Sequence, residues 1–432
     1  MIMRVSSYWS AGVAVTDSEL KVPLDWARPE SSAEITLFVR ELCAPENKGK
    51  EVPVLLYLQG GPGGSGPRPT PTSGWVKTAL QSYRIVLLDQ RGTGRSQPLS
   101  STQFRSFNDP DLAADYLTKF GADSIIRDAE QIRKTCYQGQ KWSTLGQSYG
   151  GFLTLTYLSF APEALHSCLI AGGLPSLQPS AEEVYRRTYP RVRQKNASFY
   201  QQYPGDKERV ARIADILQRQ DVRLPDGDRL SVRRFQSLGL DFGMKPGFER
   251  LHWLLDEAFE ADGETLSPGF LEAVQSRTSF RGNPLFAVLQ ENIYRHGSNG
   301  ATRWAADREA ERHPDFDVAQ RPLLFTGEMI YRWMFEEISE LMPFKAAADI
   351  LAEREQHASL YDLERLASNE VPVAAAVYFD DMYVDSYLQL ETAEKVGNTR
   401  AWVTNEFEHD GIGQPGVFAR LREMITENGG SI

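Results

Sequence analysis

The sequence of 432 residues is poor in cysteine and contains no long apolar run. Its three cysteines, Cys43, Cys136 and Cys168, are odd in number and far apart, which argues against a disulfide framework and a metal cluster. No run is long enough to span a bilayer, and the start of the chain lacks the apolar segment of a secretory signal. These absences predict a soluble protein of the reducing cytoplasm that neither binds a membrane nor holds a metal ion.

Positive charge is also scarce relative to negative charge. The chain has 47 Lys and Arg residues against 58 Asp and Glu residues, for a net charge of −11 and a pI near 5.3. This balance argues against nucleic acid or an anionic membrane as a partner. Hydrophobic residues make up 41% and charged residues 24%, as is ordinary for a globular protein. The composition leaves open whether the protein forms a homo-oligomer.

Apolar runs of strand length alternate with helix-like segments in the first part of the chain. Continuous apolar runs are typical of parallel strands that are buried on both faces. We assign strands to residues 12–15, 34–40, 53–58, 84–88, 142–145 and 165–171. Strands that alternate with helices predict an α/β fold with a mostly parallel sheet flanked by helices.

The pattern changes at about residue 175. Helical periodicity dominates from there, as with Val210, Ile213 and Leu217 on one face. Strand patterns return at 371–379 and 400–404. We therefore expect a large helical cap inserted after the sixth strand, with the core formed by residues 1–175 and 346–432 and the cap by residues 176–345.

Residues 146–150 read Gly-Gln-Ser-Tyr-Gly, the pattern G-x-S-x-G. A β-prone run precedes this pattern and a helix-like run follows it, as in a sharp strand-to-helix turn that exposes a nucleophilic serine. Glycines suit such a turn because a Cβ would collide with the neighbouring strand or helix. Ser148 is the candidate nucleophile. The alternative is a glycine-flanked serine in an ordinary turn.

A serine hydroxyl needs a base within hydrogen-bond reach and a third group that orients the base. Of the six histidines, only His409 lies just past the last predicted strand, where such a base is expected. Asp380 and Asp381 follow the strand that ends at 379. We favour Asp381 because its offset leaves room for a turn, and Asp380 stays open as the acid.

Residues 59–67 form a glycine-rich loop directly after a buried strand. Uncovered backbone N–H groups in such a loop can bind a phosphate or the oxyanion of acyl transfer. No Gly-Lys-Ser/Thr follows, so the loop does not fit a phosphate-binding motif. We expect the N–H groups of Gly60 or Gly61, together with that of Tyr149, to form an oxyanion hole.

These motifs together resemble those of the prolyl aminopeptidases, or proline iminopeptidases, of the α/β-hydrolase superfamily. The family pattern His-Gly-Gly-Pro-Gly appears at 59–63 with Gln59 in place of the histidine. Asp-Gln-Arg-Gly-x-Gly-x-Ser appears at 89–96, and Gly-x-Ser-x-Gly-Gly at 146–151. The length resembles that of the larger subgroup with a long cap. The resemblance implies an α/β-hydrolase fold and cofactor-independent release of N-terminal proline from short peptides through an acyl-enzyme.

The family also places glutamates in the cap to bind the charged amine of the substrate, since a buried cation needs carboxylates beside it. Glu291 and Glu328 lie in apolar segments of the predicted cap and are the candidates. Alternatively, each caps a helix or pairs with a cap arginine. The triad does not fix the leaving group, so an esterase, amidase or lactonase remains open. An inactive binding protein is disfavoured by the ordered Ser, Asp and His.

Overall fold

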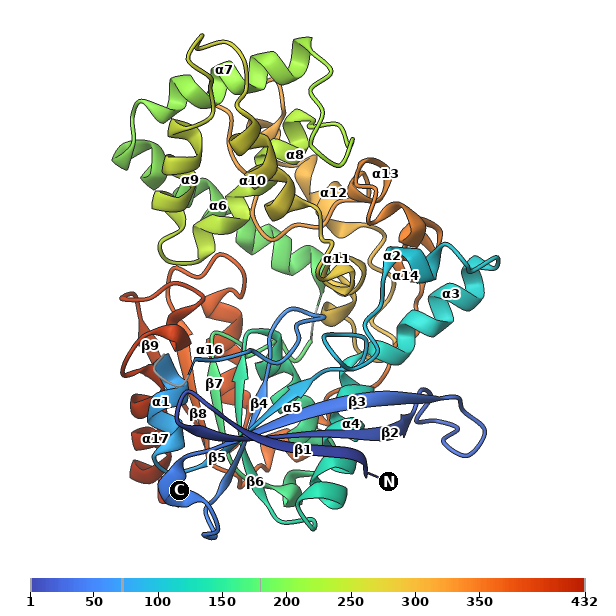
Figure 1. The fold of residues 1–432 in the computed structure, drawn as a ribbon. Helices are drawn as coiled ribbons and strands as arrows, with labels where there is room; N and C mark the ends of the chain where they lie inside the picture. The colour runs from blue at the N-terminus through green and yellow to red at the C-terminus, as the bar shows by residue number, and fades with distance from the viewer. Residues whose placement is uncertain (1, 71–73, 179, 431–432) are drawn as a thin grey trace.

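The computed structural model describes residues 2–70, 74–178 and 180–430. Within these residues nine strands form one sheet in the order β1-β2-β3-β5-β4-β6-β7-β8-β9 (Figure 1). The first three strands pair antiparallel, and every neighbouring pair from β5 to β9 is parallel. The strands are β1 (Ile2–Ser10), β2 (Val13–Pro23), β3 (Glu34–Cys43), β4 (Val54–Leu58), β5 (Arg84–Asp89), β6 (Trp142–Gln147), β7 (Leu165–Ala171), β8 (Val373–Tyr378) and β9 (Thr399–Thr404).

The central strands are buried on both faces, as their apolar runs predicted. In β4, Leu55 and Tyr57 pack into a layer with the helices of residues 74–80 and 417–427, whereas Leu56 and Leu58 pack into the opposite layer with the helices of residues 122–136 and 149–160. Successive side chains of a strand point to opposite faces, so one apolar strand fills both layers. The core helices are α1 (Gly74–Leu80), α2 (Ser101–Phe104), α3 (Pro110–Leu117), α4 (Ala122–Cys136), α5 (Tyr149–Phe160), α15 (Leu363–Ala367), α16 (Ser386–Lys395) and α17 (Val417–Glu427).

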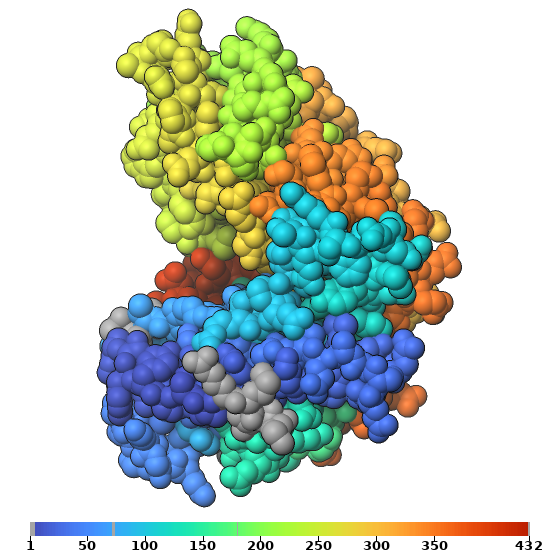
Figure 2. All heavy atoms as spheres, turned by 45° about the vertical axis from the view of Figure 1, so that its right-hand side comes forward, coloured from blue at the N-terminus to red at the C-terminus, as the bar shows by residue number. Residues whose placement is uncertain are grey.

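Between β7 and β8 the described residues form helices and two isolated β-bridges, without a further strand of the sheet. The α-helices that precede α15 in this segment are α6 (Ala181–Gln202), α7 (Asp206–Arg219), α8 (Val232–Gln236), α9 (Gly247–Asp256), α10 (Pro268–Thr278), α11 (Pro284–Leu289), α12 (Ala305–Ala310), α13 (Met334–Glu337) and α14 (Lys345–Glu353). Helices α6 to α10 rise above the sheet (Figure 1), and a hollow separates them from the core in the space-filling view (Figure 2). The predicted parallel sheet with flanking helices and a helical insertion is confirmed.

The boundaries of the cap remain a proposal. We propose a core of residues 1–175 and 346–432 and a cap of residues 176–345. Strand β7 ends at Ala171, and the first helix of the insertion, α6, begins at Ala181. At the other end, α14 starts at Lys345 and packs against α3 of the core.

The insertion follows β7, which is the seventh strand in chain order. The sequence analysis counted this strand as the sixth because it did not predict β1. Residues 5–10 of β1 are all exposed, so the strand lacks the buried alternation that identifies a strand in sequence. Strand β1 is recognised only in the structure, by its antiparallel pairing with β2, in which Ser7 lies opposite Thr16. No helix among the described residues has the length and apolar character needed to cross a membrane.

Candidate active site

Ser148 lies at the junction of β6 and α5 with φ 55° and ψ −126°, a backbone conformation that is strained for a residue with a side chain. Its N–H donates to the carbonyl of Ala171 at 3.0 Å, which ties the turn to β7. A Cβ at Gly150 would lie 1.9 Å from the Leu58 oxygen, and one at Gly146 would lie 2.3 Å from the Gly150 oxygen. The glycines of the motif are therefore required by close backbone packing.

Asp381 and His409 form a buried pair beyond the ends of β8 and β9. The Nδ1 of His409 lies 2.7 Å from Oδ2 of Asp381 and donates to it. The other carboxylate oxygen of Asp381 accepts the N–H groups of Tyr383 at 2.8 Å and Val384 at 3.1 Å. These bonds fix the carboxylate, so the ring orientation of His409 is fixed as well and Nε2 is left for another partner.

Asp380, the alternative acid, points elsewhere. Its side chain is 38% exposed, and Oδ1 lies 3.8 Å from Nη1 of Arg191 on α6. The adjacent Asp381 side chain is fully buried. The structure therefore brings Asp381, and not Asp380, into contact with His409.

The environment of His409 favours its protonated form. Burial alone lowers the pKa of this imidazole, but the charge of Asp381, its hydrogen bond and the nearby charge of Glu328 outweigh burial. The pKa of His409 is consequently raised above 6.5. A raised pKa strengthens the imidazole as a general base once it is deprotonated.

The glycine-rich loop after β4 passes next to the serine. A Cβ at Gly60 would lie 2.9 Å from the Cβ of Ser148, so the two residues are in direct proximity. Gly61 has φ 130°, a conformation that favours glycine. The carbonyl of Gln59 accepts a hydrogen bond from the Gln90 side chain at 2.8 Å. This bond ties the backbone at residue 59 to the loop after β5.

Glu328 lies in the insertion between β7 and β8, within electrostatic reach of Asp381 and His409. Burial raises its pKa to about 8, with a further contribution from the charge of Asp381, while His409 and a hydrogen bond with Gln290 act in the opposite direction. Among the described residues, no lysine or arginine is ion-paired with this carboxyl. Glu328 is thus a half-buried acid with a raised pKa and without a basic partner in the described part of the chain.

Glu291 has a different environment. Its two carboxylate oxygens accept the N–H groups of Ala305 at 3.1 Å and Ala306 at 2.9 Å, at the start of α12. Burial raises the pKa of Glu291 to about 7, and these hydrogen bonds oppose the rise. The structure therefore gives Glu291 the helix-capping contacts that were its alternative role, and amine binding by Glu291 stays a prediction.

Three tyrosines that the sequence did not single out lie within electrostatic reach of Glu328. The rings of Tyr185 and Tyr294 meet edge to face at 6.4 Å, and the ring of Tyr383 lies 4.8 Å from that of His409. Burial raises the pKa of all three phenols, and the Glu328 charge raises each further. Tyr294 follows Glu291 in the same apolar segment, which was the only local signal for any of them.

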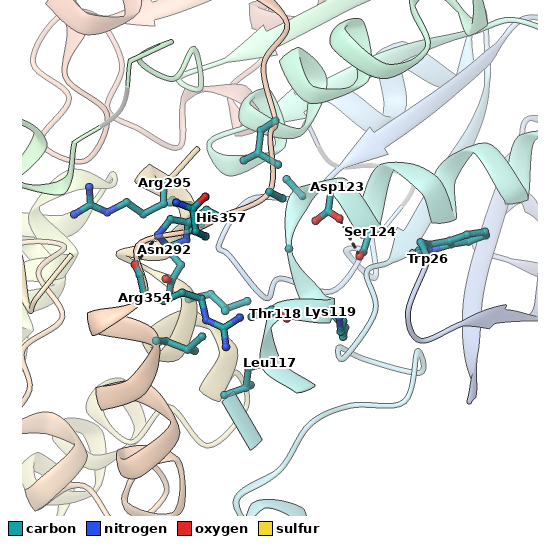
Figure 3. A pocket seen from close by; sticks show the side chains of 18 of the residues that line it. Trp26, Leu117, Thr118, Lys119, Asp123, Ser124, Asn292, Arg295, Arg354 and His357 are labelled. Atoms are coloured by element: carbon teal, nitrogen blue, oxygen red, sulfur yellow. Dashed lines mark hydrogen bonds between the residues drawn. The ribbon is translucent and has the colours of Figure 1, made fainter. Parts of the chain in front are cut away.

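A separate cavity of about 310 Å³ opens between the start of α4 and the cap. Asn292, Arg354 and His357 lie on one side of it and Asp123 and Ser124 on the other (Figure 3). Tyr149 contributes to its lining, but the serine, aspartate and histidine of the site do not. In the described part of the chain, no group of three or more His, Cys, Asp or Glu residues could hold a metal ion.

The fold and the strained serine turn define the chain as an α/β-hydrolase, and the sequence profile of the family described as alpha/beta hydrolase fold matches residues 53–258. The chain is 49% identical over 392 residues to a proline iminopeptidase of Aeromonas sobria, covering 90% of this chain and 91% of that protein. It is 34% identical over 444 residues to proline iminopeptidase aneH of Aspergillus aculeatus, covering 98% and 97%. The chain therefore belongs to the proline iminopeptidase family of enzymes, as its motifs predicted.

Proposed function

We propose that this enzyme is a serine exopeptidase that releases N-terminal proline from short peptides, with Ser148 as nucleophile, His409 as base and Asp381 as the acid that orients the base. The names of the relatives support proline as the released residue. The observation that carries the proposal is the unpaired Glu328 carboxyl beside the Asp381–His409 pair. It puts a site for a positive charge next to the site of bond cleavage.

In this mechanism His409 Nε2 takes the proton of the Ser148 hydroxyl as the oxygen attacks the prolyl carbonyl. The N–H groups of Gly60 or Gly61 and of Tyr149 stabilise the oxyanion, a contribution worth about 3 kcal/mol per donor. His409 then gives the proton to the leaving amine, which departs with the rest of the peptide. Water hydrolyses the prolyl ester on Ser148 by the same proton transfers, and free proline leaves.

Glu328 binds the charged secondary amine of the substrate, and Tyr185 and Tyr294 enclose the pyrrolidine ring. A peptide without a free N-terminus offers no cation for this carboxyl. Because its pKa is raised to about 8, the carboxyl of the free enzyme takes up a proton at higher pH than an ordinary glutamate does. Binding of the ammonium stabilises the ionised form, so binding releases a proton and strengthens as the pH rises toward 8.

We expect Glu328→Gln to lower kcat/KM for a proline arylamide by roughly tenfold to a thousandfold, or about 1.4–4 kcal/mol. The amide keeps the shape but cannot pair with the ammonium. A small uncharged aryl ester should react nearly as fast as with the wild type, because the serine and histidine are untouched. The measurement is kcat/KM on both substrates, and the rise of proline arylamide cleavage toward pH 8 should weaken in the variant.

Glu291→Gln is the matched comparison, since it neutralises the other candidate glutamate of the cap. From its bonds to Ala305 and Ala306 we expect a lower unfolding midpoint and little change in the ratio of the two substrates. A selective loss on the proline substrate would instead assign amine binding to Glu291. Equal losses on both substrates for Glu328→Gln would make Glu328 a structural residue, and no loss would move the amine site.

A further inference from the structure

The loop that carries His409, residues 406–410, is bonded to the cap along most of its length. The N–H of His409 donates to the carbonyl of Gly243 at 2.9 Å. Two residues further, the N–H of Lys245 donates to Oδ1 of Asp410 at 3.1 Å, and its ammonium donates to the carbonyl of Glu406 at 2.8 Å. The cap residues 243–245 therefore hold this loop at the histidine and on both sides of it.

A further connection between the loop and the cap is an ion pair between Lys195 and Glu408. Lys195 is on α6, and its ammonium lies 2.5 and 2.6 Å from the two carboxylate oxygens of Glu408. The side chains are only 11% and 17% exposed, and the residues are 213 positions apart in sequence. A poorly solvated pair in this geometry is sensitive to the loss of either partner, because the remaining charge is left uncompensated.

The core holds the histidine from the opposite direction. Asp381 accepts the bond from the ring, and the Gln147 side chain donates to the His409 carbonyl at 3.5 Å. The loop of the acid is joined to the cap as well, since the Tyr383 hydroxyl donates to the carbonyl of Leu240. The position of the imidazole is therefore determined jointly by the core and by the cap.

We propose that Lys195 and Glu408 are positioning residues for His409, and that through this pair the docked cap keeps the imidazole in its working geometry. The inference rests on the proposed role of His409 as the base. Neither residue touches the substrate in this account. Their contribution is to the backbone position of the histidine, so they affect the chemical step more than substrate binding. Misplacement of a catalytic group by about 1 Å is enough to lower the rate by about a hundredfold.

The test uses Lys195→Met, Glu408→Gln and the double variant. We expect each single variant to lower kcat for a proline arylamide by roughly tenfold to a hundredfold, with KM changed less than about threefold. The double variant should be no worse than the poorer single variant, because both changes break one connection. Lys195→Arg, which keeps the charge, should recover most of kcat.

Labelling of Ser148 by a neutral phosphonate probe separates positioning from general stability. Its rate depends on activation of the serine by His409 and not on the substrate amine. We expect slower labelling in both single variants and a shifted pH dependence of labelling. Arg193→Met is the control, because Arg193 lies two positions away on α6 and pairs within the cap with Asp315 at 2.5 Å. It should label at the wild-type rate.

The possible outcomes distinguish this inference from the proposed function. If the wild type is labelled on Ser148, and folded Glu408→Gln and Lys195→Met both behave like Arg193→Met in every assay, the positioning role is wrong and the catalytic assignment stands. If the wild type is not labelled on Ser148, the catalytic assignment itself fails. If Lys195→Met does not fold, Glu408→Gln decides the matter, since it keeps the shape of the side chain and a hydrogen-bonding oxygen.

Discussion

Replacement of Ser148 or His409 by alanine should abolish turnover of a proline arylamide and leave the protein folded. Either change removes a group that takes part in bond making or proton transfer, and such losses range from roughly a thousandfold to a millionfold in kcat. Alanine at 148 keeps a Cβ at the strained turn, so it adds no new backbone cost. The measurement is kcat beside the unfolding midpoint of each variant.

The stability comparison for His409→Ala needs a stated pH. The folded-state pKa of His409 is raised above 6.5, so its proton stabilises the fold fully below pH 6.5, and this contribution disappears as the pH rises through the raised value. A comparison of unfolding midpoints above that value therefore excludes the effect of the proton.

Retention of more than roughly a tenth of the wild-type kcat by either Ser148→Ala or His409→Ala would contradict the assignment of Ser148 as nucleophile and His409 as base.

Asp381→Asn should have the second-largest effect, a loss of kcat that approaches about ten thousandfold. The asparagine can still accept the N–H groups of Tyr383 and Val384 through its oxygen. It then presents an NH₂ group to Nδ1 of His409, which favours the wrong tautomer of the imidazole. The fold should persist, and kcat on the proline arylamide is the measurement.

Asp380→Asn is the matched control one residue away. Because Asp380 is partly exposed and lies 3.8 Å from Arg191, its neutralisation should leave kcat nearly unchanged. The reverse ranking of the two variants would transfer the role of the acid to Asp380.

The sequence predicted those features that depend on local pattern. The apolar runs of β4, β5 and β7 indicated buried parallel strands, and the glycines around Ser148 indicated a tight turn. The edge strand β1 was missed because its exposed residues carry no periodic signal. Neighbouring Asp380 and Asp381 could not be separated fully, since the turn after β8 decides which carboxylate faces inward.

The parts of the site that depend on distant contacts were beyond the sequence. Glu291 and Glu328 both lie in apolar segments, and only the folded chain shows that the start of α12 lies against Glu291. The pairing of Lys195 with Glu408 joins residues 213 positions apart, so neither position carries a local signal. Tertiary packing, and not residue type, distinguishes the roles of these side chains.

The most direct test of the proposed function compares kcat/KM for a proline arylamide with that for its N-acetylated form on the same wild-type enzyme. The blocked substrate has no cation and would leave the Glu328 carboxyl without its partner. We predict that acetylation lowers kcat/KM by at least about a hundredfold, or about 2.7 kcal/mol. Equal cleavage of the free and the blocked substrate would contradict the proposal that this enzyme recognises a free N-terminal proline.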